Sequence, residues 1–276
     1  MAPYRKSPMK LNASRSLIAL LLSVLVAPLS GGSAVAQQPA GQAPLTTAPP
    51  GAAALEPAVM ETLKRMSDLL KGAKSFTFSY RTAREQVAQT GQIVDFLHVA
   101  RVALTRPNKL RIDITGTLWN TILRYDGKVV TLFDPTQRFY SQIEAPPTID
   151  DTLMRLMDKY ETSFPVAGVL LADPYEKMRD GLKTAVDLGV VNVDGIRVRH
   201  LLFGEDDADW QLWVEDGQRP LPRRLAIVYK KAPGAPRVAV TFSDWNLSPG
   251  VPSGRFVFVK PPQAIQVELK TAPPGS

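Results

Sequence analysis

Alternating apolar and polar residues dominate the chain after position 74, and this alternation predicts strands. In the segment SFTFSYR at 75–81 every second side chain is aromatic, as is typical of a strand with one buried face and one wet face. Similar segments follow at 94–104, 109–114, 118–125, 128–133 and 138–143. Six consecutive strands joined by short links indicate an antiparallel meander.

The period becomes helical in two places. Residues 57–72 begin with a proline and place apolar side chains at every third or fourth position, which predicts an amphipathic helix. Residues 148–181 form a second helical block, in which Thr148 and Asp151 lie at the spacing of a capping box. The apolar stripe of this block consists of Leu153, Leu156, Met157 and Tyr160.

Strand-like segments resume after the helical block, at 185–193, 196–203, 209–215, 223–230, 237–245 and 256–259. Asp-Gly pairs at 126–127, 194–195 and 216–217 indicate turns. The order predicts a mainly β protein with α-helices (α+β). About eleven strands form one large, strongly bent antiparallel sheet, with the helices on one face. We expect a single domain over 55–270, with the helical block inserted at 148–181.

The first 36 residues have the composition of a secretory signal peptide. Four bases precede a run at 17–27 that is apolar except for Ser23, and the sequence AVA at 34–36 provides a cleavage site before Gln37. A membrane anchor is the alternative, but a run of eleven residues falls short of the roughly 20 that a spanning helix needs. Residues 37–54 are rich in Pro, Ala, Gly, Thr and Gln and predict a disordered lead, and 271–276 form a tail.

Removal of this leader would bring the net charge of the chain close to zero. The whole chain carries 33 Lys and Arg against 26 Asp and Glu, but four of the bases lie in the leader, which leaves 29 against 26. The near balance argues against nucleic acid as a partner. The chain has no cysteine, which excludes disulfides, thiol catalysis and a lipid attached at the cleavage site. We therefore expect an exported protein with no stable membrane anchor.

Signatures of catalysis or metal binding are missing from the sequence. Only His98 and His200 offer an imidazole, and neither G-x-S-x-G nor H-E-x-x-H occurs. The acidic cluster at 205–209 does not fit a calcium loop, because Gln211 and Gly217 stand where such a loop needs Gly and Glu. A solvated turn explains the cluster better. We predict no catalytic residues, no metal and no cofactor.

Several longer segments carry a resemblance to a known family. They are RPNKL at 106–110, YDG at 125–127, DWQLWVEDG at 209–217, RPLPRR at 219–224, FSDWN at 242–246, and FVF at 256–258 before the proline pair at 261–262. With these segments the chain resembles a family of predicted periplasmic proteins of unknown function, related to the lipoprotein carriers LolA and LolB. The resemblance implies a periplasmic location and an unclosed, LolA-like half-barrel with helices on its concave face. It also implies an apolar cavity that receives acyl chains.

The aromatic and methionine side chains are the candidates for lining such a cavity. Each of them taken singly is explained by an ordinary packed core. A sheet bent around few helices is difficult to fill completely, however, and methionine suits adaptable apolar surfaces. The candidate ligand-binding residues are Phe78, Tyr80, Trp119, Leu156, Met157 and Trp210.

Two functional hypotheses follow from this reading. The first is a non-enzymatic periplasmic carrier or sensor of an acyl chain, lipid or lipoprotein. The second is a protein-interaction module in envelope assembly or envelope-stress signalling, with an envelope protein as its partner.

Overall fold

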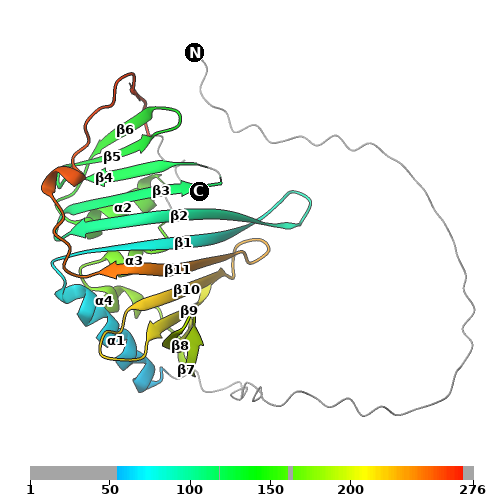
Figure 1. The fold of residues 1–276 in the computed structure, drawn as a ribbon. Helices are drawn as coiled ribbons and strands as arrows, with labels where there is room; N and C mark the ends of the chain where they lie inside the picture. Colours follow the sequence, from blue (N-terminus) through cyan, green and yellow to red (C-terminus); the bar gives the residue numbers. More distant parts are fainter. Residues whose placement is uncertain (1–54, 118, 161–163, 270–276) are drawn as a thin grey trace, which may run out of the picture. The chain divides into compact units, whose positions relative to one another are not determined.

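The computed structural model describes residues 55–117, 119–160 and 164–269 (Figure 1). The predicted signal peptide at 1–36, the lead at 37–54 and the tail at 271–276 lie outside these residues.

Twelve strands within the described residues form one sheet, in the order β12-β6-β5-β4-β3-β2-β1-β11-β10-β9-β8-β7. The first half of the chain contributes β1 (Ser75–Val87), β2 (Ile93–Thr105), β3 (Lys109–Gly116), β4 (Thr121–Tyr125), β5 (Val129–Asp134) and β6 (Phe139–Glu144). The second half contributes β7 (Thr184–Val193), β8 (Ile196–Gly204), β9 (Ala208–Glu215), β10 (Pro222–Tyr229), β11 (Arg237–Asn246) and β12 (Ile265–Gln266).

The sheet is unclosed and almost entirely antiparallel. Its two end strands, β12 and β7, do not pair with each other, and only the two-residue β12 runs parallel to its neighbour β6. The two halves of the chain meet where β1 pairs with β11. Figure 1 shows β1 and β2 crossing the middle of the curved sheet, with the helices behind it. The predicted half-barrel of about eleven antiparallel strands is confirmed, with β12 as a short addition.

Four α-helices cover one face of the sheet: α1 (Pro57–Gly72), α2 (Ile149–Tyr160), α3 (Ala167–Leu170) and α4 (Pro174–Met178). Their apolar sides and the inward side chains of the strands form one hydrophobic core. Phe76, Phe78 and Tyr80 of β1 are buried in it, as the alternation at 75–81 predicts. Helix α1 buries Val59, Leu63, Met66 and Leu70 against the same face.

Side-chain hydrogen bonds determine where the inserted helices begin and how they are held. The Thr148 hydroxyl accepts a hydrogen bond from the Asp151 amide at 3.1 Å and caps α2, as the sequence predicts. The Asp173 carboxylate accepts from the Glu176 amide at the start of α4. Arg106, in the β2–β3 connection, donates to the main-chain carbonyls of Leu170 and Leu171. The helical block is thereby tied to the centre of the sheet.

Two of the predicted Asp-Gly turns differ in their geometry. Asp194 and Gly195 both adopt positive φ, 51° and 79°, and join β7 to β8 in a two-residue turn. At 126–127 only the glycine has positive φ, 95°, and the Asp126 carboxylate accepts from the amides of Lys128 and Val129. This turn is therefore shaped by a side chain as well as by the backbone.

The prediction of a strand at 256–259 is wrong. Residues Ser253–Phe256 form a short 3₁₀ helix, η1, and the segment after it joins no ladder. Prolines at 249, 252, 261 and 262 remove amide donors on both sides of the segment. Phe258 packs instead beside the rings of Phe133 and Tyr140, at centroid distances of 5.7 and 5.0 Å.

Candidate functional site

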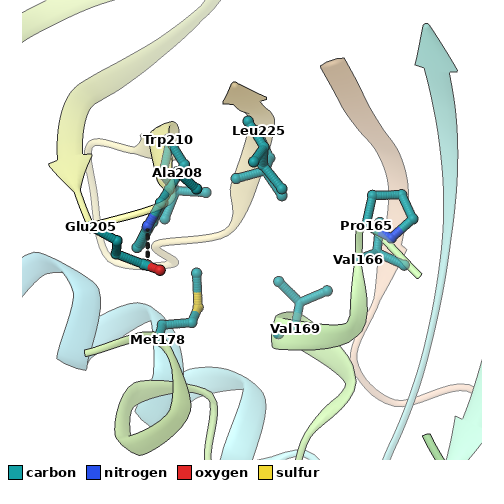
Figure 2. Close-up of a pocket in the computed structure, with 11 residues that line it drawn as sticks. Pro165, Val166, Val169, Met178, Glu205, Ala208, Trp210 and Leu225 are labelled. Atoms are coloured by element: carbon teal, nitrogen blue, oxygen red, sulfur yellow. Dashed lines mark hydrogen bonds between the residues drawn. The ribbon is translucent and has the colours of Figure 1, made fainter. Parts of the chain in front are cut away.

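An apolar pocket of about 210 Å³ lies between the second half of the sheet and the short helices (Figure 2). We call it the apolar pocket. The sheet side comes from β9 and β10, and the other side from α3, α4 and the residues just before α3. Its lining residues are Pro165, Val166, Gly168, Val169, Met178, Glu205, Ala208, Trp210, Leu212, Leu225 and Ile227.

The local sequence explains why these side chains reach the pocket. In β9 the side chains of Ala208, Trp210 and Leu212 point to the helix-covered face, because alternate residues of a strand share a face. Gly168 of α3 faces Met178 of α4, since a Cβ at this position would lie in van der Waals contact with the Met178 Cγ, at 3.4 Å. Met178 is unbranched and flexible, so this wall can adapt to the shape of an apolar occupant.

The ring of Trp210 is held firmly as one wall of the pocket. Its Nε1 donates to the Glu205 carboxylate at 2.7 Å, and the ring stacks on Phe203 at a centroid distance of 3.9 Å. Figure 2 shows the Glu205–Trp210 hydrogen bond at one end of the pocket, with Met178 below it. This bond holds the Glu205 carboxylate beside the indole, and the rest of the pocket lining is apolar.

A second hollow of about 80 Å³ lies on the same face, over the centre of the sheet. We call it the Arg84 pocket. Its lining residues are Tyr80, Thr82, Arg84, His98, Ile114, Trp119, Pro165 and Val238. Pro165 lines both pockets, so the two hollows lie next to each other.

The polar groups of the Arg84 pocket have shifted pKa values. Burial lowers the pKa of His98, and the neighbouring positive charge of Arg84 lowers it further. Burial raises the pKa of Tyr80, so its hydroxyl stays protonated at neutral pH. The site therefore offers one guanidinium, one neutral imidazole and one neutral phenol.

The structure distributes the six candidate residues among three places. Trp210 lines the apolar pocket, and Tyr80 and Trp119 line the Arg84 pocket. Phe78 and Leu156 are buried in the hydrophobic core, and Met157 packs partly buried against it. Trp119 is 44% exposed and precedes β4 instead of belonging to it.

Several lining residues were not singled out from the sequence. Val169 and Met178 come from helices of only four and five residues, whose period is too short to show a face. Leu225 and Ile227 alternate within a predicted strand, but the alternation alone does not say that the helices leave a gap above them. Arg84 lies on the same face of β1 as Tyr80, but it comes after the segment at 75–81 in which apolar and polar residues alternate regularly.

Neither a membrane span nor a metal site is found in the described part of the chain. No helix there is long and apolar enough to cross a membrane. Over the same residues, no three His, Asp or Glu side chains gather as a metal site would need.

An unclosed antiparallel sheet, helices over one face and an apolar pocket between them define a half-barrel α+β protein with room for a small apolar group. The chain belongs to the family of predicted periplasmic proteins DUF2092, whose model matches residues 59–270. Among curated proteins, none matches the chain.

Solved structures with a similar fold have low sequence identity to the chain. An uncharacterized conserved protein from Thermus thermophilus is 12% identical, with 76% of this chain and 99% of that chain covered and a TM-score of 0.45. The lipoprotein LppX from Mycobacterium tuberculosis is 16% identical, with 71% and 100% covered and a TM-score of 0.40. A LolA superfamily protein from Nitrosomonas europaea is 12% identical, with 72% and 97% covered and a TM-score of 0.34.

Proposed function

We propose that this protein is a non-enzymatic periplasmic binding protein that takes up the acyl chain of a lipid or lipoprotein in the apolar pocket. The observation that carries the proposal is the pocket itself, about 210 Å³ between β9–β10 and α3–α4 with almost entirely apolar walls. Burial of an acyl chain contributes about 0.8 kcal/mol per CH₂ group. A cavity of this kind therefore binds usefully without any catalytic group.

The export signal supports this role. Cleavage before Gln37 releases a chain with no cysteine for lipid attachment, which suits a carrier that diffuses between membranes. N-terminal sequencing of the protein purified from the periplasm is expected to begin at Gln37. Retention of the leader in a membrane fraction would contradict this part of the proposal.

Binding is tested with the uncharged fluorescent probe N-phenylnaphthylamine. We expect the wild-type protein to bind the probe and to release it to a fatty acid. Mass spectrometry of an organic extract of the periplasm-purified protein is expected to show acyl lipids. A wild-type protein that binds no probe and yields no lipid contradicts the proposal.

A pocket-filling variant connects this binding to the apolar pocket. Ala208→Phe places a ring in the pocket from the start of β9, and we expect it to weaken probe binding at least about tenfold. Ala83→Phe is the matched control, because Ala83 lies on the opposite face of the sheet, on β1, and lines neither pocket. Equal binding by the two variants would place the ligand elsewhere.

A protein-interaction module is the second candidate, favoured by the far end of the β1–β2 hairpin. Ile93 and Leu97 are 60% and 57% exposed there, on the face away from the helices. Figure 1 shows this hairpin extending beyond the neighbouring strands. A single envelope protein that cross-links to the wild type but not to Leu97→Ser, with no lipid in the extract, would favour this module over the carrier.

A further inference from the structure

The two pockets lie side by side on the inner face of the sheet. Ile227 of the apolar pocket is paired with Val238 of β11, and Val238 is paired with Arg84 of β1. Neighbouring strands lie about 4.8 Å apart, so Arg84 is two strands, or about 10 Å, from Ile227. Pro165 lines both hollows, so the distance between them is short enough for one extended molecule to span.

The inner face of β1 changes character along its length. Phe76 and Phe78 are buried in the hydrophobic core, whereas Tyr80, Thr82 and Arg84, farther along the same face, line the Arg84 pocket. The lining is therefore apolar toward the helices and polar toward the end of the strand. This arrangement matches a ligand that is itself apolar at one end and polar at the other.

His98 is a buried polar side chain without a partner in this pocket. It is only 7% exposed, and its Nε2 has no hydrogen-bond partner within the described residues. A buried donor or acceptor left unpaired costs about 1–3 kcal/mol. The ring lies 4.6 Å from that of Trp119, and a Cβ at Gly116 would approach its Cδ2 to 2.1 Å. Glycine at this position is thus what makes room for the imidazole.

Arg84 adds an uncompensated positive charge to the same pocket. Its guanidinium makes no ion pair with any side chain that the structure describes. Its charge acts on His98 and also on Tyr229, whose pKa it lowers against the larger effect of burial. Guanidinium donors form their strongest hydrogen bonds with carboxylate or phosphate oxygens.

We propose that the Arg84 pocket is a head-group site, which binds the anionic carboxylate or phosphate of an amphiphile whose acyl chain occupies the apolar pocket. Arg84 donates charge-assisted hydrogen bonds to the anionic oxygens. His98, in the tautomer with its hydrogen on Nε2, donates one more. Trp119, whose ring lies beside the imidazole, belongs to the same lining. The inference rests on the proposed acyl-chain binding and adds the chemical class of the ligand.

The test compares three twelve-carbon competitors against N-phenylnaphthylamine: dodecanoate, dodecyl phosphate and uncharged dodecanol, all below micelle formation. We expect at least one anionic competitor to bind the wild type about tenfold or more tightly than dodecanol. The better anion tells whether the site prefers a carboxylate or a phosphate. Inorganic phosphate alone is expected to leave the probe bound. Displacement of the probe by inorganic phosphate would overturn the proposal that the ligand is an amphiphile.

Variants then assign the preference to these side chains. Arg84→Gln is expected to remove the preference for the anion while dodecanol binding stays unchanged, and Arg84→Lys is expected to retain part of it. His98→Gln is expected to reduce the preference several-fold. Arg101→Gln is the matched control, since Arg101 is exposed on β2 and lines neither pocket. Thermal unfolding of each variant checks that it is folded.

The outcomes separate this inference from the proposed function. Equal binding of all three competitors by the wild type overturns the head-group site and leaves acyl-chain binding intact. An anion preference that survives in Arg84→Gln also overturns it. Failure of every competitor and of the probe to bind overturns the proposed function itself.

Discussion

The guanidinium of Arg106 donates to the main-chain carbonyl of Leu171 over 2.7 Å, and this bond joins the centre of the sheet to the end of α3. A second bond reaches the carbonyl of Leu170 at 3.2 Å. Arg106 also lies 5.6 Å from the ring of Phe76, so its charge is held between the core and the helical block. Helix α3, which forms part of the wall of the apolar pocket, is therefore held to the sheet by a side chain from the β2–β3 connection.

Replacement of Arg106 is expected to destabilise the protein and to weaken the attachment of α3 to the sheet. In Arg106→Met the two carbonyls lose their charged donor, and the free energy of unfolding is expected to fall by about 1.5–3 kcal/mol. Urea denaturation measures the change. Hydrogen exchange of the Val169 amide, which bonds to the carbonyl of Val166, is expected to accelerate beyond the global effect. The exposed residue Arg101 is the control, and Arg101→Met is expected to change stability by less than about 0.5 kcal/mol.

The hydrogen bond between Trp210 and Glu205 predicts different effects for two substitutions of the same residue. Glu205→Leu leaves the indole Nε1 without its acceptor and is expected to destabilise the protein by about 1–3 kcal/mol. Glu205→Gln retains an acceptor oxygen and is expected to cost less than about 1 kcal/mol. Chemical denaturation followed by tryptophan fluorescence measures both. Equal costs would show that the bond does not hold the ring.

Acid is expected to destabilise the protein through its two histidines. Burial lowers the pKa of both His98 and His200 below the ordinary value of 6.5. Below about pH 6.5 the unfolded chain then binds more protons than the folded one, so stability falls as the pH falls. The free energy of unfolding should decrease between pH 7.5 and pH 5, and His98→Gln should reduce that decrease. An unchanged slope in this variant would contradict the lowered pKa of His98.

Two positions on α2 provide a matched test of packing in the helical block. Leu156 is buried in the core, whereas Met154 on the same helix is 37% exposed. Leu156→Ala is expected to cost about 2–5 kcal/mol because it leaves a cavity. Met154→Ala is expected to cost less than about 1 kcal/mol. Thermal unfolding of the two variants compares them directly, and similar costs would mean that α2 packs loosely on the sheet.

Features with a local period were predictable from the sequence. The alternation at 75–81 identifies the inward face of β1, because successive side chains of a strand point to opposite sides. The stripe that contains Leu156 likewise identifies the buried side of α2. The cap at Thr148 follows from a three-residue spacing. Each of these depends only on neighbours along the chain.

The candidate site needed the tertiary structure. Strand register pairs Ile227 with Val238 of the next strand and Val238 with Arg84, which is far away in sequence. The space beneath Pro165 depends on how closely α3 and α4 approach the sheet, which no local pattern encodes. Trp119, expected among the cavity residues, lines the Arg84 pocket beside His98, whose ring has room because residue 116 is glycine. The sequence alone thus determines which faces are apolar, whereas long-range packing decides where they fail to fill the interior and which polar groups lie beside the gap.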